Sequence, residues 1–159
     1  MNTAYLLIGG NIGERERYLE RARNLIAERC GELKIISSIY ETAAWGKTDQ
    51  PMFLNQAIEI LTPLEPMKLL QQVLEIEKQL GRARREKYGP RNIDIDILFY
   101  NKEIHSDSLL IIPHPALQYR RFALEPLNEI APNFVHPVLK KTIAELLEKC
   151  PDNLPATRL

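Results

Sequence analysis

Cysteine, histidine and long apolar runs are all scarce in this 159-residue sequence. The two cysteines, Cys30 and Cys150, are too few for a disulfide-rich fold and indicate reduced thiols in a cytoplasmic protein. The three histidines are not spaced like zinc ligands, which argues against a transition-metal centre. The first residues, MNTAYLLIGGN, have no basic flank, and their apolar run is too short for a secretory or membrane segment. We therefore expect no membrane association.

Net charge is also absent, because 21 basic and 21 acidic side chains cancel. A neutral chain has no overall field that would attract nucleic acid, so no nucleic-acid partner is expected. Apolar residues make up 45% of the chain and charged residues 26%, as in ordinary globular proteins. There is no internal repeat, low-complexity tract or linker, so residues 1–159 are predicted to form a single domain. No exposed heptad pattern is evident, which favours a monomer.

The basic charge that is present is concentrated in residues 81–91, GRARREKYGPR. Five basic side chains stand there against one acidic side chain, which gives a local charge of +4: Arg82, Arg84, Arg85, Lys87 and Arg91. Arginine meets phosphate oxygens in a bidentate geometry. A basic loop alone, however, is more often a solvated loop or a weak nucleic-acid patch.

Two aspartates follow this loop, within a strand predicted over residues 93–100, IDIDILFY, by its β-branched and aromatic residues. Side chains alternate along a strand, so Asp94 and Asp96 share a face, roughly 6–7 Å apart. Leu98 and Tyr100 are expected to continue that face. A D-x-D pair alone is often the solvated face of an edge strand. Next to a cluster of guanidinium groups, it indicates polyphosphate held with magnesium.

The remaining periodicity predicts a mixed α and β chain. Helices are predicted over residues 14–29, 66–80 and 142–149, and strands over 4–8, 33–42, 52–61 and 93–100. The order β-α-β-β-α-β predicts an α+β, ferredoxin-like core, with helices packed on a mainly antiparallel sheet. Glu77, near the end of the second helix, is expected to be solvated, in preference to orienting an arginine or contacting a nucleotide. The tail, residues 151–159, is expected to be loosely ordered.

Three further features allow more than one interpretation from the residues alone. Phe53 and Asn55 share a strand face, which by itself indicates a core residue beside a polar edge. Trp45 lies in a loop, as either a lid over a site or a packing anchor. His114 lies between two prolines, which suits either a rigid turn or a ligand contact.

The segment KYGPRNIDIDIL, together with IGGNIG, DQPMFLN, IIPHP and RRFALEPLNEIAP in this order, resembles the 6-hydroxymethyl-7,8-dihydropterin pyrophosphokinases of folate biosynthesis. The resemblance covers nearly the whole chain, and the block from Gly89 to Ile97 is its most specific part. It implies transfer of a pyrophosphoryl group from ATP to the pterin hydroxymethyl group, with release of AMP. It also implies the same α+β architecture, and two Mg²⁺ ions that bind with ATP.

The resemblance assigns roles residue by residue. The implied catalytic residues are Arg82, Arg91, Asp94 and Asp96, and the two aspartates are the implied metal ligands. The implied ATP contacts are Arg82, Arg84, Lys87, Arg91, Ile97, His114 and Arg120. The implied pterin contacts are Thr42, Ala43, Trp45, Phe53, Asn55, Tyr88, Asp94 and Phe122, with Phe53 and Phe122 stacking on the ring and Asn55 reading its edge.

This chain departs from the family pattern at several of these positions. Tyr88 stands where tryptophan is common, Ala43 and Ala44 replace two prolines, and Ala116 replaces an arginine. Which of Arg120 and its neighbour Arg121 reaches the phosphates is left open. Two rival functions remain from the sequence alone: an RNA-binding module of the same topology, and a small-molecule sensor without chemistry.

Overall fold

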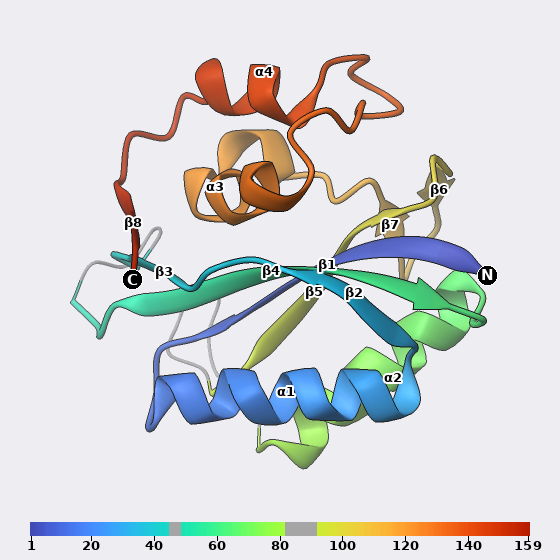
Figure 1. The fold of residues 1–159 in the computed structure, drawn as a ribbon, viewed down its shortest axis with the longest axis horizontal. Coiled ribbons are helices and arrows are strands. Elements are labelled where there is room, and N and C mark those ends of the chain that lie inside the picture. Colours follow the sequence, from blue (N-terminus) through green and yellow to red (C-terminus); the bar gives the residue numbers. More distant parts are fainter. Residues whose placement is uncertain (45–48, 82–91) are drawn as a thin grey trace.

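The structure, a computed structural model, describes residues 1–44, 49–81 and 92–159. One central sheet has helices on both sides (Figure 1). Helices α1 (Arg15–Arg29) and α2 (Pro66–Gln79) pack on one face, α3 (Arg121–Ile130) packs on the other, and α4 (Ile143–Glu148) packs on the outer side of α3. No helix in these ranges is long and apolar enough to cross a bilayer.

The sheet has six strands, counted over the described residues, and all of their pairings are antiparallel. The strands are β1 (Asn2–Gly10), β2 (Glu32–Ile36), β3 (Tyr40–Thr42), β4 (Phe53–Thr62), β5 (Asp94–Tyr100) and β8 (Ala156–Arg158). Their order is β5-β1-β4-β3-β8, and β2 also pairs with β4. A separate hairpin joins β6 (His105–Ser106) to β7 (Ile111–Ile112), followed by the 3-10 helix η1 (Leu117–Tyr119).

Both faces of β1 are buried, as its apolar composition requires. Ala4, Leu6 and Ile8 face α1 and α2 and have no solvent-exposed area. Tyr5 and Leu7 face the other way, into a second cluster with α3 and α4. The mixed fold with helices on a mainly antiparallel sheet is confirmed, and the order β-α-β-β-α-β holds when β2 and β3 are counted as one interrupted strand.

That interruption corrects the prediction of one continuous strand over residues 33–42. Ser37 lies between β2 and β3 and is buried. Its backbone N–H donates to the carbonyl of Ala57 at 2.9 Å, and its hydroxyl accepts the N–H of Ala57 at 2.9 Å. A side chain therefore replaces a backbone carbonyl at this point of the ladder, and the strand breaks there.

A β-bulge in β5 corrects the prediction for Tyr100. Tyr5 pairs with Phe99 but Leu6 pairs with Ile97, so Leu98 is an extra residue on β5. Leu98 lies on the α3/α4 side, as expected, whereas Tyr100 packs in the α1/α2 cluster. The extra residue shifts the alternation, so Tyr100 turns away from the face that carries the aspartates.

The C-terminal region is more ordered than its composition predicts. The helix expected over residues 142–149 is confirmed as α4, whose first turn is capped by reciprocal hydrogen bonds between Thr142 and Glu145. The tail, expected to be loose, forms β8 against β3, and Leu159 N–H donates to the carbonyl of Ile39 at 2.9 Å. Backbone pairing orders this segment, even though the tail has few apolar residues to bury.

Candidate active site

Three adjacent strands bring an amide, a glycine and a carboxylate into one line. Gly9 of β1 pairs with Asn55 of β4 on one side and with Asp94 of β5 on the other. Neighbouring strands lie about 4.8 Å apart, so the backbones of Asn55 and Asp94 are about 10 Å apart across Gly9. All three residues lie on the face of the sheet that also carries α3.

Gly9 is glycine because the side chain of Asn55 occupies the space above it. A Cβ atom at position 9 would collide with Oδ1 of Asn55 and would lie 2.7 Å from the carbonyl oxygen of Leu54. Asn55 is 5% exposed, so its amide is held down against the backbone of β1. A glycine inside a strand often marks such a close approach.

Asp94 and Asp96 project from β5 on the same face, as the strand period predicts, and both side chains are half-buried. Leu7 pairs with Asp96 and lies in the apolar cluster under α3. Carboxylate oxygens of this kind are hard ligands that suit Mg²⁺. The ranges described contain no group of three or more His, Cys, Asp or Glu side chains that could hold a metal on their own.

Glu77 of α2 supports this pair from the side of β5, and the prediction that it is solvated is wrong. The residue is 4% exposed, and its Oε2 accepts the N–H of Ile95 at 2.7 Å. Ile95 lies between the two aspartates, so Glu77 fixes the backbone on which both are carried. The signal was available, because Glu77 follows Val73 by four residues and therefore lies on the buried stripe of the helix.

His114 follows the β6–β7 hairpin and lies within electrostatic range of Asp94 and Arg120. Its backbone N–H donates to the carbonyl of Leu98 at 3.0 Å, which ties this segment to β5. The pKa of His114 is lowered from 6.5 to about 4, mainly by burial and then by the charge of Arg120, while the charge of Asp94 opposes the shift. The ring is therefore neutral at pH 7. Its Nδ1 accepts the N–H of Ala116 at 3.2 Å, so the ring proton is on Nε2, which can donate to a ligand.

The two adjacent arginines before α3 point to different surroundings. Arg121 is held by the tail and by its own helix: its Nε donates to the carbonyl of Asp152 at 2.8 Å, and its Nη1 lies 3.4 Å from Glu125. Arg120 lies close enough to His114 to shift its pKa, and its guanidinium carbon lies 5.7 Å from the ring centroid of Phe122. Arg120 is therefore the one of the two that faces the candidate site.

The implied ring-binding residues come from β3, β4 and α3. Phe53 and Asn55 lie on one face of β4, and Thr42 of β3 pairs with Phe53. Thr42 is 2% exposed, whereas Phe53 and Phe122 are half-buried. Ala43, just after β3, is half-buried too.

Residues 50–52, which lead into β4, are hydrogen-bonded to residues before and at the start of α1. Asn11 donates to the side chain of Gln50 and to the carbonyl of Pro51, both at 2.9 Å. Arg15 Nη1 lies 2.7 Å from Glu41 and 2.9 Å from the carbonyl of Met52. These contacts tie the residues before and at the start of α1 to β3 and to the residues just before β4.

Several implied site residues lie outside the described residues: Trp45, Arg82, Arg84, Lys87, Tyr88 and Arg91. The basic loop therefore stays a prediction. Ile97, an implied ATP contact, is described, and its side chain is 5% exposed within the α1/α2 core. Any contact between Ile97 and ATP would come from its backbone.

The described arrangement can bind a flat polar ring and an anion at the same time. Aromatic rings on β4 and α3 offer stacking area, and the buried amide of Asn55 offers a donor and an acceptor. The guanidinium of Arg120 and the Nε2–H of His114 are donors for an anionic group. Asp94 and Asp96, on the strand beside Gly9, can hold a hard cation between these two regions.

Comparison with known proteins gives a consistent result. The family model described as 7,8-dihydro-6-hydroxymethylpterin-pyrophosphokinase (HPPK) matches residues 5–132. The 2-amino-4-hydroxy-6-hydroxymethyldihydropteridine pyrophosphokinase of Aquifex aeolicus is 43% identical over 145 residues, which are 91% of this chain and 90% of that protein. The enzyme of the same name from Bacillus subtilis is 46% identical over 130 residues, covering 81% of this chain and 78% of that one.

Solved structures agree on the fold. A crystal structure of an HPPK-DHPS in complex with substrates has a TM-score of 0.76 at 18% identity, over 92% of this chain and 43% of the other. A Plasmodium falciparum HPPK-DHPS structure gives 0.76 at 20% identity, over 93% and 43%. This chain thus spans less than half of those longer proteins. On the family match and the two enzyme relatives, the chain belongs to the 7,8-dihydro-6-hydroxymethylpterin-pyrophosphokinase family.

Proposed function

We propose that this protein transfers the terminal diphosphate of ATP to the hydroxymethyl group of 6-hydroxymethyl-7,8-dihydropterin, in folate biosynthesis. The hydroxymethyl oxygen bonds to the β-phosphorus, the bond from that phosphorus to the oxygen bridging to the α-phosphorus breaks, and AMP leaves. The hydroxyl proton is lost to solvent or to a base. Membership of the family supports the reaction, and the line Asn55–Gly9–Asp94 is the observation in this chain that carries it.

The pterin ring is proposed to bind over β4, between Phe53 and Phe122. Stacking supplies most of the contact area, while the amide of Asn55 pairs with the ring edge. Because Asn55 is nearly fully buried, a ring that cannot pair with its amide would leave a buried polar group unsatisfied, which costs about 1–3 kcal/mol. Thr42 and Ala43 complete this side of the site, and Trp45 and Tyr88 are proposed to cover the bound ring.

The triphosphate is proposed to bind on the side of Asp94 that carries His114 and Arg120. Arg120 supplies a permanent positive charge, and neutral His114 supplies its Nε2–H without adding charge. Arg82, Arg84, Lys87 and Arg91 are proposed to supply the remaining positive charge. Phosphoryl transfers depend mainly on alignment and charge stabilisation, which these donors provide.

Two Mg²⁺ ions are proposed to bind with ATP at Asp94 and Asp96. The two carboxylates fit this ion, which commonly uses one or two protein carboxylates and completes its shell with phosphate oxygens and water. When bound, such ions neutralise phosphate charge and lower the pKa of a nearby hydroxyl. Glu77 holds the backbone between the two carboxylates, so their spacing is set before any ion binds.

The decisive experiment measures AMP release from ATP with the purified protein. AMP should form only when Mg²⁺ and the hydroxymethyl pterin are both present, and chelation with EDTA should stop it. Pterin binding without AMP release would indicate a sensor instead, and AMP release that ignores pterin would indicate another ATP-cleaving activity. We also propose that the protein is a cytoplasmic monomer acting on small molecules, which size-exclusion chromatography with light scattering would test for its oligomeric state.

A further inference from the structure

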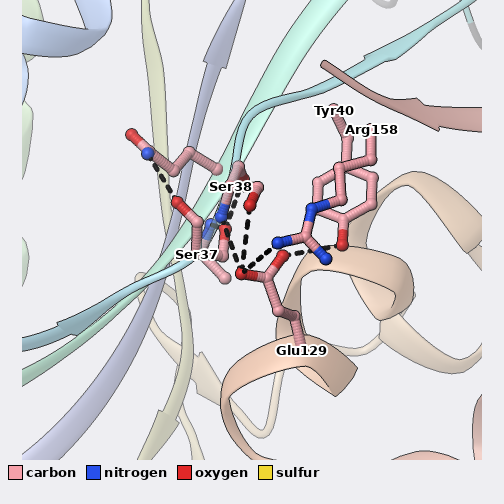
Figure 2. Close-up of polar contacts among 7 residues, drawn as sticks. Ser37, Ser38, Tyr40, Glu129 and Arg158 are labelled. Atoms are coloured by element: carbon pink, nitrogen blue, oxygen red, sulfur yellow. Dashed lines mark hydrogen bonds and ion pairs between the residues drawn. The ribbon is translucent and has the colours of Figure 1, made fainter.

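The carboxylate of Glu129, near the end of α3, accepts hydrogen bonds from β3 and from the residues just before it, next to the proposed pterin site (Figure 2). Glu129 Oε1 accepts the phenolic hydroxyl of Tyr40 at 2.7 Å, and Oε2 accepts the backbone N–H of Ser38 at 3.0 Å and its hydroxyl at 3.2 Å. Arg158 of β8 lies 3.8 Å from Oε2. Glu129 thus joins α3 to β3 and to the C-terminal strand at one point.

The contact is partly exposed to solvent, and Glu129 stays charged at neutral pH. The side chain of Glu129 is 23% exposed. Burial opposes ionisation, but the hydrogen bonds from Tyr40 and Ser38 hold the pKa of Glu129 below its ordinary value. Burial and the bond to Glu129 raise the pKa of Tyr40 to about 12, so the phenol keeps its proton. Hydrogen bonds to a charged acceptor are the stronger kind.

The two partners of this contact, Tyr40 on the sheet and Glu129 on α3, each lie near residues that are proposed to hold the pterin ring. On the sheet, Tyr40 pairs directly with Asn55, and Thr42, two residues on, pairs with Phe53. On the helix, Phe122 precedes Glu129 by seven residues, which is about two turns and about 10 Å, so the two side chains project in nearly the same direction. Helix α3 packs along β4 and β3, so one wall of the proposed ring site is on the helix and the other is on the sheet.

We propose that Glu129 is a positioning residue that sets the separation between Phe122 on α3 and the β3–β4 side of the site, and with it the affinity for the pterin ring. This inference rests on the proposed function. Two aromatic walls hold a flat ring well only at one spacing, because dispersion contacts weaken within 0.5–1 Å of excess gap. A carboxylate that binds Tyr40 of β3 and Ser38, two residues before it, resists such a change in gap.

The test separates pterin binding from ATP binding. The dissociation constant of the pterin is measured from its fluorescence, and that of ATP with Mg²⁺ by calorimetry without pterin. Glu129→Ala should weaken pterin binding roughly tenfold, the effect of losing about 1.4 kcal/mol, and change ATP binding less than twofold. Tyr40→Phe removes only the phenol contact and should weaken pterin binding by a smaller factor in the same direction.

Two further variants sharpen the result. Glu129→Gln should restore part of the affinity, because an amide oxygen still accepts the N–H of Ser38. Glu125→Ala is the matched control, since Glu125 lies one turn earlier on α3 and pairs with Arg121 instead. It should leave pterin binding unchanged.

Equal weakening of pterin and ATP binding would show a general loss of structure and overturn the inference. So would unchanged pterin binding in Tyr40→Phe and Glu129→Ala, or in Tyr40→Phe alone if Glu129→Ala does not fold. In either case pterin-dependent AMP release by the wild-type protein would leave the proposed function standing. A wild-type protein that neither binds pterin nor releases AMP would overturn both.

Discussion

Replacing Gly9 with alanine tests whether the buried amide of Asn55 forms hydrogen bonds with the edge of the pterin ring. The new Cβ would collide with Oδ1 of Asn55 and lie 2.7 Å from the carbonyl oxygen of Leu54. The asparagine side chain can rotate away, whereas the carbonyl belongs to the β4 ladder and cannot move without disturbing its pairing with β1. Overpacking of this kind costs about 1–3 kcal/mol, and we expect about 2 kcal/mol less free energy of unfolding.

The larger effect should be on pterin affinity. A displaced Asn55 no longer presents its amide to the ring edge, and losing such a pairing costs about 1–3 kcal/mol, or roughly 10- to 100-fold in the dissociation constant. ATP binding should be retained, because the atoms nearest to the new Cβ belong to Asn55 and Leu54 and not to Arg120 or His114. Pterin fluorescence titration gives the affinity, and urea unfolding gives the stability.

A double-mutant cycle and a control variant distinguish displacement of Asn55 from a general loss of stability. In the background of Asn55→Ala, adding Gly9→Ala should cause no further loss of pterin affinity, since the displaced group is already gone. Gly31→Ala is the control, because a Cβ there also meets backbone, at Leu61, but at the far end of β4. It should lower stability without changing the pterin dissociation constant. If Gly9→Ala bound pterin as tightly as the wild-type protein, the proposed role of Asn55 would be refuted.

Three further outcomes are expected. Asp96→Asn should lower turnover by roughly 10²- to 10⁴-fold and weaken pterin binding only a few-fold, measured by AMP release across a Mg²⁺ titration; near-normal turnover would exclude it as a metal ligand. Glu77→Ala leaves the buried N–H of Ile95 without its carboxylate partner and should lower the free energy of unfolding by about 1–3 kcal/mol. Glu77→Gln should keep most of the wild-type stability. Unchanged hydrogen exchange at Ile95 in Glu77→Ala would contradict this expectation. Because folding lowers the pKa of His114 from 6.5 to about 4, the unfolded chain binds more protons in that interval, so stability from this group is lost as pH falls from 6.5 towards 4. Urea unfolding at pH 7.5 and 4.5 should therefore show a smaller pH effect in His114→Gln than in the wild-type protein.

Local patterns in the sequence were sufficient for the elements and for part of the site. The helix and strand periodicities predicted the ends of six elements to within two residues: α1, α2, α4, β1, β4 and β5. The alternation of β5 placed Asp94 and Asp96 on one face. These predictions hold because each depends only on residues close together in the chain, where steric preferences and burial act directly.

The line of Asn55, Gly9 and Asp94 was not visible in the sequence, because it depends on the register of three strands that are far apart in the chain. Register follows from which side chains fit across the sheet, and no local pattern encodes that fit. The bulge at Leu98 and the strand β8 were missed for the same reason. The burial of Glu77 could have been inferred, since it occupies a position on the buried helical stripe.

The face of β1 towards α3 explains why the site lies where it does. Going along the strand, this face carries Tyr5, Leu7 and then Gly9, so the side chains become smaller in the direction of Asn55 and Asp94. Tyr5 and Leu7 are covered by the α3/α4 cluster, and each has one apolar and one acidic cross-strand partner, whereas both partners of Gly9, Asn55 and Asp94, are polar. Residues that stabilise the fold on β1 are therefore followed on the same face by a glycine whose two cross-strand partners are proposed to bind ligands. It follows that polar substitutions at Leu7 should unfold the protein, whereas isosteric ones at Asp94, which pairs with Gly9 on the neighbouring strand β5, should leave its stability nearly unchanged and remove its activity.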